Sequence, residues 1–153
     1  MLDQLQSLFA SFQKNDVKYL VIGGIAAVLY GVPRATFDLD VLIEPTRDNA
    51  ERLLCAMIEA GLGTASLTNA EDLLSKEITI FTDRIRLDVQ TSTPGISFEQ
   101  AWERRVTMNY RGQILEVISL GDLIASKRAA GRDVDLEDVR ILKSTEVNST
   151  RED

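Results

Sequence analysis

The sequence predicts an α+β fold, because helix-like and strand-like patterns are interspersed along the chain. Apolar residues recur at helical spacing over residues 2–14, whereas short runs such as DLDVLI alternate with the two-residue period of a strand. The chain has 153 residues, and no linker or repeat interrupts it. We therefore expect a single domain over residues 1–143, followed by a frayed polar tail over residues 144–153.

The first half of the chain predicts helices and strands joined by glycine turns. The strand-like run VKYLVI, residues 17–22, ends at Gly23-Gly24, and the short helical run IAAVLYG follows. DLDVLI, residues 38–43, reads as the second strand. A helix over residues 47–60 follows, with Gly61 as its stop. Its buried face is predicted to comprise Ala50, Leu53, Leu54, Met57 and Ile58.

The second half predicts two strand pairs and a C-terminal pair of helices. EITIFT and RIRLDVQT alternate as strands around a tight turn at residues 82–84, and residues 106–118 read as a hairpin turning at Arg111-Gly112. Short helices are expected over residues 69–76 and 97–105. Residues 119–144 predict two helices broken at Gly131-Arg132.

Composition excludes several kinds of chemistry. The chain has no histidine, which rules out imidazole-based triads and imidazole zinc sites. Its one cysteine, Cys55, excludes an internal disulfide, and we expect it in the core or at its boundary. The formal net charge of −7 argues against broad nucleic-acid binding. No run is long enough to cross a membrane and no signal peptide is evident, so we expect a cytoplasmic protein.

Two acidic residues stand at the start of the second strand. Asp38 and Asp40 are two positions apart and therefore point to the same face, with Leu39 and Val41 on the other. Like charges this close repel, and a divalent cation would remove the conflict. Mg²⁺ prefers such oxygen ligands and completes its shell with water and substrate phosphates. The alternative is that both residues lie on a solvated strand end.

Two further features support a phosphate-handling site. Gly23-Gly24 follow a strand and open a helix, where glycine permits close approach of the backbone to a phosphate. An ordinary tight turn is the alternative for this pair. Asp88 lies in another strand, between Leu87 and Val89, and is a third acid embedded in apolar alternation.

The combination GG…PRATFDLDVLIE…IRLDVQ resembles the nucleotidyltransferase superfamily with the DNA polymerase β-like fold. Within it, the chain is similar to the small bacterial branch of minimal nucleotidyltransferases and AbiEii-type toxin nucleotidyltransferases. The resemblance covers residues 17–142. Family members often have Gly-Ser where this chain has Gly23-Gly24, so no serine hydroxyl is available there to reach a phosphate.

The resemblance implies a mixed, twisted sheet flanked by helices, and a two-metal mechanism with Mg²⁺ or Mn²⁺. Asp38, Asp40 and Asp88 would be the catalytic residues and the metal ligands, with Asp88 on the acceptor side. The reaction would transfer a nucleoside monophosphate from an NTP, such as ATP, to a hydroxyl acceptor. That acceptor would be a protein, an RNA such as tRNA, or a small molecule.

The resemblance and the turn position also nominate nucleotide-binding residues. Besides the two glycines, Arg34 and Thr36 precede the acidic pair and would line the site entrance, a role in the turn being the alternative. Lys127 and Arg132 lie in a segment resembling the K…R…D…D pattern of this branch and would contact phosphates. Helix-face ion pairing, for instance of Arg132 with Asp135, is the alternative. Asp138 completes the pattern.

Other readings of the sequence stay open. The aromatic residues Tyr30, Trp102 and Tyr110 are expected to pack in the core rather than to stack on a base. The main alternative function is a catalytically silent nucleotidyltransferase-like module that binds a partner in a toxin–antitoxin type system. A different Mg²⁺-dependent enzyme using D-x-D is a second alternative. A homodimer or an antitoxin-like partner protein is a possible assembly.

Overall fold

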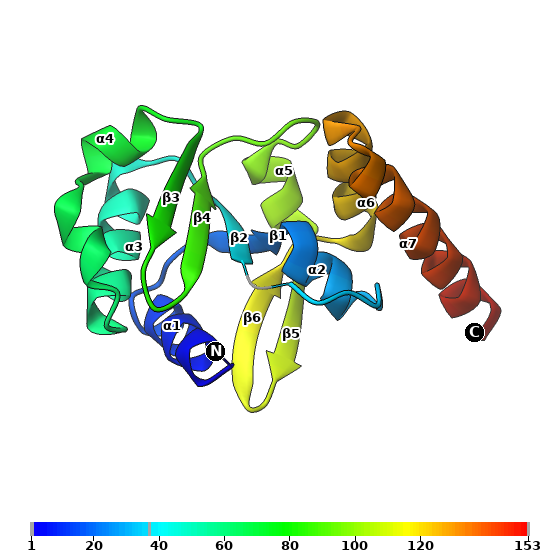
Figure 1. Ribbon diagram of the computed structural model, residues 1–153, viewed down its shortest axis with the longest axis horizontal. Coiled ribbons are helices and arrows are strands. Elements are labelled where there is room, and N and C mark those ends of the chain that lie inside the picture. Colours follow the sequence, from blue (N-terminus) through cyan, green and yellow to red (C-terminus); the bar gives the residue numbers. More distant parts are fainter. Residues whose placement is uncertain (1, 37, 153) are drawn as a thin grey trace.

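The computed structural model describes the backbone of residues 2–36 and 38–152, and the side chains of residues 5–36 and 38–146. Its strands form one mixed sheet in the order β3-β4-β2-β1-β6-β5 (Figure 1). The strands are β1 (Tyr19–Ile22), β2 (Asp38–Ile43), β3 (Ile78–Thr82), β4 (Arg86–Gln90), β5 (Val106–Tyr110) and β6 (Gln113–Val117). In the centre, β2 is antiparallel to β1 and parallel to β4.

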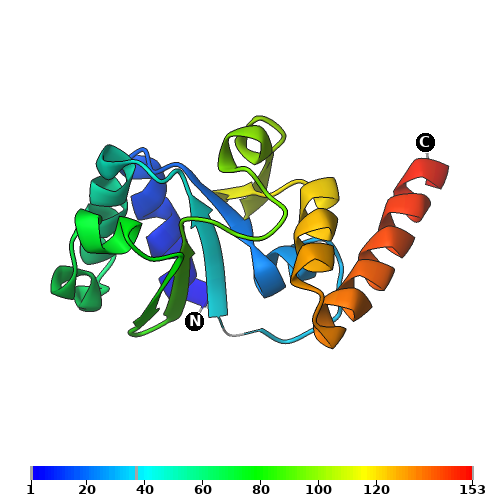
Figure 2. The ribbon, with the colours of Figure 1, turned by 90° about the horizontal axis from the view of Figure 1, so that it is seen from above.

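Seven α-helices and one short 3₁₀ helix accompany these strands within the described residues. They are α1 (Leu2–Lys14), α2 (Gly23–Leu29), α3 (Arg47–Glu59), η1 (Gly63–Leu67), α4 (Ala70–Leu74), α5 (Phe98–Glu103), α6 (Leu120–Ala130) and α7 (Asp133–Glu152). Figures 1 and 2 show α1, α3 and α4 on one side of the molecule, and the pair α6–α7 on the other. The mixed α+β fold with a C-terminal helical pair is therefore confirmed.

Helix boundaries follow from capping residues in the sequence. The side chains of Thr46 and Asn69 accept hydrogen bonds from the third residue on, and so cap α3 and α4. Ser119 caps α6 in the same way through the N–H of Asp122. Gly131 adopts φ 69° and ends α6, where a residue without a side chain is favoured. The break predicted between the two C-terminal helices is thus confirmed.

The two faces of the central strands have opposite characters. Leu39, Val41, Leu87 and Val89 are at most 1% exposed and belong to the hydrophobic core. The opposite face of β2 and β4 carries the half-buried acids at the intervening positions. Alternation along each strand therefore separates the buried core from a polar face.

Two sequence expectations about packing and one about a helix end are wrong. Cys55 is exposed on α3 rather than in the core or at its boundary. Ile58 is 49% exposed, because it lies at the outer edge of the apolar stripe whose centre is Leu53 and Met57. The second C-terminal helix, expected to end at residue 144, continues as α7 to Glu152. No glycine or proline follows Gly131 to stop that helix.

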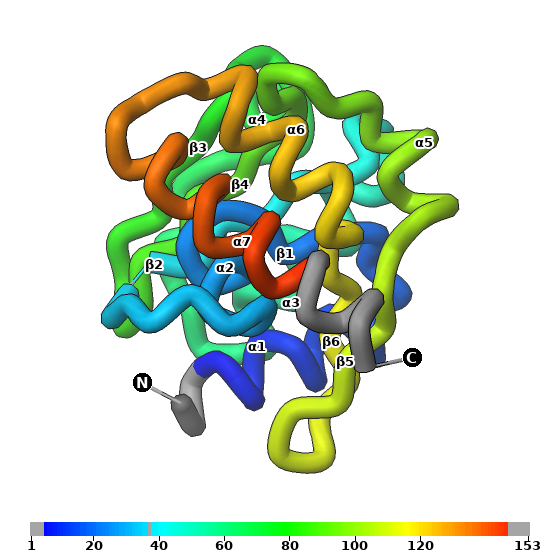
Figure 3. Tube along the Cα trace, turned by 90° about the vertical axis from the view of Figure 1, so that its right-hand side faces the viewer, coloured from blue at the N-terminus to red at the C-terminus, as the bar shows by residue number. Residues whose placement is uncertain are grey.

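The C-terminal helices α6 and α7 lie on the same side of the sheet as the short helix α2. Figure 3 shows α6 and α7 in front, with α2 and the strands behind them. Helix α2 contacts β1, β2 and α6, so it lies between the sheet and the C-terminal pair. Over the ranges that the structure describes, no helix is both long and apolar enough to cross a bilayer.

Candidate active site

The three predicted acids meet on one face of the sheet. Asp40 on β2 and Asp88 on β4 are register partners on adjacent parallel strands, so their side chains are direct neighbours. Asp38 lies two residues before Asp40 on the same face. The tertiary fold therefore brings Asp88 next to the acidic pair, although 48 positions separate it from Asp40 in the chain.

The electrostatic conflict between these acids is concentrated on Asp40. Burial raises its pKa to about 7, and the neighbouring charges of Asp88 and Asp38 act in the same direction. A hydrogen bond with Asp88 adds to the effect, while the positive charge of Arg86 opposes it. Asp40 thus lies in an environment that disfavours its charged form in the absence of a cation.

Gly23 permits this arrangement because it has no side chain. Its φ of +68° is one that other residues rarely adopt, and a Cβ added there would collide with the carboxylate of Asp40. Gly24, the second residue of α2, is also closely approached, since a Cβ added there would lie 3.0 Å from the Thr36 hydroxyl. The backbone after β1 therefore lies directly beside Asp40 at Gly23 and beside Thr36 at Gly24.

The sequence reasoning missed Arg86. This residue lies two positions before Asp88 on β4 and is the register partner of Asp38. Its Nε lies 3.2 Å from Asp88 Oδ1 and 3.8 Å from Asp38 Oδ2. The i, i+2 spacing with Asp88 was a visible signal in RIRLDVQ, because both residues had to share a strand face. The contact with Asp38 depends on the pairing of β2 with β4.

A cleft of about 490 Å³ brings together the acids and the other predicted residues. Its lining includes every site residue that the sequence predicted: Gly23, Gly24, Arg34, Thr36, Asp38, Asp40, Asp88, Lys127 and Arg132. These residues come from β1–α2, the loop before β2, β2 itself, β4, and the α6–α7 region. The cleft therefore lies between the polar face of the sheet and the C-terminal helices.

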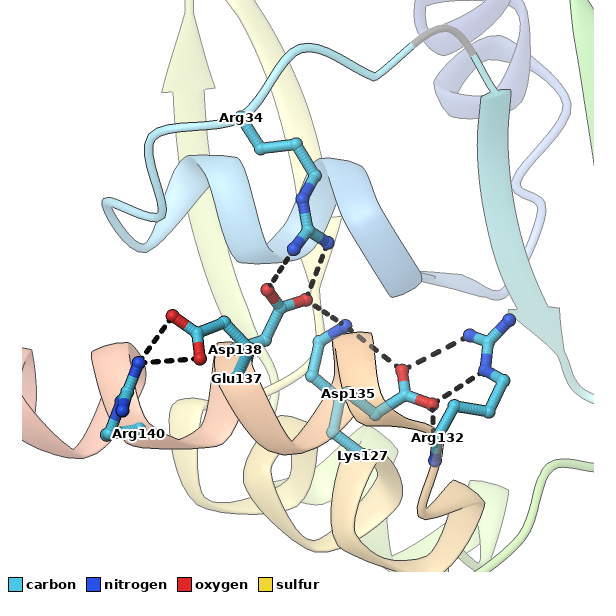
Figure 4. A network of polar contacts seen from close by, with 7 residues as sticks. All are labelled: Arg34, Lys127, Arg132, Asp135, Glu137, Asp138 and Arg140. Carbon is cyan, nitrogen blue, oxygen red and sulfur yellow. Dashed lines mark hydrogen bonds and ion pairs between the residues drawn. The ribbon is translucent and has the colours of Figure 1, made fainter.

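Basic residues form the wall opposite the acids, and carboxylates of α7 hold them (Figure 4). Asp138 is fully buried, and its Oδ2 lies 2.9 Å from both Lys127 Nζ and Arg34 Nη1. Its Oδ1 lies 2.6 Å from Arg34 Nη2, an ionic contact outside hydrogen-bond geometry. The network connects α7 to α6 and to the loop before β2.

Asp135 extends this network to the first turn of α7. Arg132 Nε donates a hydrogen bond of 2.7 Å to Asp135 Oδ2, and Lys127 Nζ lies 3.8 Å from Asp135 Oδ1. Burial opposes the charged form of Asp135, but its hydrogen bond and ion pairs outweigh burial and lower its pKa. The ion pairing considered for Arg132 therefore exists, and three cations face two carboxylates in this wall.

The aromatic residues lie outside the cleft, as the sequence predicts. Tyr30, Trp102 and Tyr110 are partly buried against the hydrophobic core. Tyr30 donates a hydrogen bond to the carbonyl oxygen of Ile118, and Trp102 stacks on Phe98 with ring centroids 5.7 Å apart. None of these aromatic residues lines the cleft.

The donor set of the sheet wall suits a hard divalent cation. Its candidate ligands are carboxylate oxygens only. Burial, followed by the negative charges of Asp88 and Asp38, raises the pKa of Asp40, and a cation beside this carboxylate would favour its charged form. In the part of the chain with described side chains, no three acidic or cysteine side chains form a ready-made metal cluster. Asp40 and Asp88 are the closest candidates, and Arg86 lies between Asp88 and Asp38.

Comparison with known families gives one match over nearly the whole chain. The sequence model described as "Nucleotidyltransferase of unknown function (DUF6036)" matches residues 1–149. A search of curated proteins finds no significant match.

Solved structures share the fold at low sequence identity. An antigenic nucleotidyltransferase-like protein from Paracoccidioides brasiliensis is 18% identical with a TM-score of 0.55, over 92% of this chain and 72% of that chain. TM1012, an inferred nucleotidyltransferase from Thermotoga maritima, is 14% identical with a TM-score of 0.53, over 99% of this chain and 92% of that one.

Proposed function

Since the chain belongs to the nucleotidyltransferase family DUF6036, we propose that it transfers a nucleoside monophosphate from an NTP to a hydroxyl acceptor with the help of Mg²⁺ or Mn²⁺. The observation that carries this proposal is the division of one cleft into an acidic wall and a basic wall. A metal–nucleotide complex has the complementary division, with a cation at one end and a polyphosphate at the other.

On the acidic wall, Asp38 and Asp40 would hold the cation that accompanies the triphosphate. Asp88 serves the acceptor side, where it accepts the proton of the attacking hydroxyl. When bound, the metal supplies charge neutralisation at the attacking and leaving oxygens. The acceptor oxygen bonds to the α-phosphorus, the bond from that phosphorus to the bridging oxygen breaks, and pyrophosphate leaves.

On the basic wall, Arg132 is the cation best placed to contact phosphate. Its side chain is 74% exposed, whereas that of Lys127 is 8% exposed and held by two carboxylates. Lys127 and Arg34 contribute positive charge from behind Arg132, and Gly23 and Gly24 present backbone without a side chain to the cleft. The Thr36 hydroxyl lies beside Gly24.

The substitution Asp88→Asn tests this function. We expect it to abolish transfer while retaining most affinity for Mg²⁺–NTP, because it removes the acceptor-side carboxylate and keeps the shape of the strand. Each α-³²P-labelled NTP would be incubated with Mg²⁺ and a cell lysate, and the labelled products would be counted. Binding of Mg²⁺–NTP would be measured in parallel by calorimetry.

The matched control is Asp48→Asn, the same substitution at an exposed position of α3 outside the cleft. It should leave transfer unchanged. Undiminished transfer by the Asp88→Asn protein would contradict the three-carboxylate mechanism. A silent partner-binding module predicts no transfer by the unmodified protein to any acceptor, and no difference between the variants.

A further inference from the structure

Arg86 is the cation closest to the acids of the cleft, and it lies on the same strand face as Asp88. Its side chain is 45% exposed, and it lines the cleft. Nε lies 3.2 Å from Asp88 Oδ1 and Nη2 lies 3.5 Å from Asp88 Oδ2, so the guanidinium faces both oxygens of that carboxylate. The same Nε is 3.8 Å from Asp38 Oδ2.

These contacts use the oxygens that a metal ion would need. A carboxylate that engages a guanidinium through both oxygens must give up at least part of that contact to coordinate a cation. A guanidinium stays protonated in proteins, so the positive charge of Arg86 is permanent. A divalent cation beside it would therefore meet both occupied ligands and like-charge repulsion.

We propose that Arg86 is an internal counter-ion that neutralises Asp38 and Asp88 in the metal-free protein and competes with the divalent cation for them. This inference rests on the proposed function, because it concerns the same acids. The half-exposed guanidinium is free to rotate away from the carboxylates without disturbing the core, so displacement requires no unfolding. Arg86 thereby offsets the repulsion between Asp38 and Asp88 on one sheet face until a cation replaces it.

The experiment compares Mn²⁺ binding by the unmodified protein, Arg86→Gln and Arg86→Lys, measured by electron paramagnetic resonance without nucleotide. Arg84→Gln is the matched control, because Arg84 is exposed in the preceding turn and does not line the cleft. Both glutamine variants remove one positive charge from the same part of the chain. Thermal unfolding in EDTA is measured for all four proteins.

We expect Arg86→Gln to bind Mn²⁺ about tenfold more tightly, the scale set by one nearby unit charge at a half-exposed site. The same variant should unfold at a lower temperature in EDTA, since its acids lose their counter-ion. Arg86→Lys should lie between, because lysine keeps the charge without the planar fork. Arg84→Gln should match the unmodified protein in both measurements.

The other outcomes separate this inference from the proposed function. If Mn²⁺ binds the unmodified protein and is lost in Asp40→Asn, but Arg86→Gln binds no more tightly, the counter-ion inference is overturned and the metal site stands. If neither the unmodified protein nor Arg86→Gln binds Mn²⁺, both are overturned. Binding only by Arg86→Gln supports the competition directly. Weaker binding by Arg86→Gln would mean that Arg86 orders the ligands instead.

Discussion

Asp40 is partly buried, and the negatively charged side chains of Asp88 and Asp38 are its neighbours in the cleft. Asp88 is its register partner on β4, Asp38 lies two residues away, and Gly23 has no side chain to separate the backbone from its carboxylate. Burial is the largest cause of its raised pKa of about 7, and the two acids are the next. At the residue scale, Asp40 therefore lowers the stability of the metal-free protein when it is ionised.

This reasoning predicts how stability depends on pH. Between the ordinary pKa of 3.8 and about 7, folded Asp40 holds a proton that the unfolded chain has lost. The contribution of Asp40 to the free energy of unfolding should therefore fall as the pH rises across this window. In EDTA at pH 8, Asp40→Asn should be more stable than the unmodified protein by on the order of 1 to 3 kcal/mol.

Urea unfolding followed at a series of pH values measures this gain. This gain should shrink as the pH falls below 7 and vanish below about pH 3, where Asp40 is protonated in both the folded protein and the unfolded chain. Asp48→Asn, at an exposed site on α3, should show no comparable pH-dependent gain. A gain of equal size at pH 4 and pH 8 would show that the charge of Asp40 is not its cause.

At the scale of elements, α7 is attached to the site by charge as well as by apolar packing. Val139 and Leu142 are buried in the core, while Asp135 and Asp138 reach the basic residues of the cleft wall. The attachment involves the loop before β2 through Arg34, 104 positions earlier in the chain. Helix α7 thus positions the basic wall opposite the acids.

Removing the Asp138 carboxylate should weaken the attachment of α7 to the rest of the protein. Asp138→Asn leaves Lys127 and Arg34 without their buried counter-charge, so the free energy of unfolding should fall by about 3 to 5 kcal/mol. Hydrogen exchange should increase in α6 and α7 before it increases in the central strands. The measurements are denaturant unfolding and amide exchange followed by mass spectrometry.

Glu137→Gln is the matched control, one residue away on the same helix. Glu137 pairs with Arg140 at the surface, and both side chains are more than half exposed (Figure 4). Such exposed pairs contribute about 0 to 1 kcal/mol. Equal losses in the two variants would contradict a special role for the buried network.

At the scale of the whole molecule, the sheet and the C-terminal helical pair form opposite walls of one cleft. The acids come from β2 and β4, whereas Lys127 lies on α6 and Arg132 directly precedes α7. A ligand that contacts both walls would join parts of the fold that are far apart in the chain. Binding of such a ligand should therefore stabilise the entire fold.

We expect a non-hydrolysable NTP analogue with Mg²⁺, at 100 times its dissociation constant, to stabilise the protein by about 2.7 kcal/mol. For a chain of this size that raises the unfolding temperature by roughly 5 to 11 °C. Differential scanning calorimetry measures the shift for each nucleotide. The analogue with EDTA, or with Mg²⁺ and the Asp40→Asn protein, should give a smaller shift. Equal shifts in all cases would contradict a cation-dependent site.

Much of the fold was predictable because its signals are local. Alternation in DLDVLI and RIRLDVQT indicated the buried residues Leu39, Val41, Leu87 and Val89, although Leu42, on the face of the acids, is buried as well. The glycines at 23–24, 61, 112 and 131 marked turns or helix ends. Local signals were weaker at the edges of elements. Ile58 fitted the helical stripe of α3 but is exposed, and the polar sequence after residue 144 gave no sign that α7 continues.

The sequence by itself determined that Asp38 and Asp40 share a strand face, because side chains alternate with a period of two. It also placed Asp88 in a second strand and the glycine pair at the end of another. Only the tertiary structure decided what these residues meet: the pairing of β2 with β4 sets Asp40 beside Asp88 and Arg86 beside Asp38. The packing of α7 likewise brings Asp138 to Arg34. Such contacts depend on strand register and helix packing, which no local pattern in a single sequence specifies.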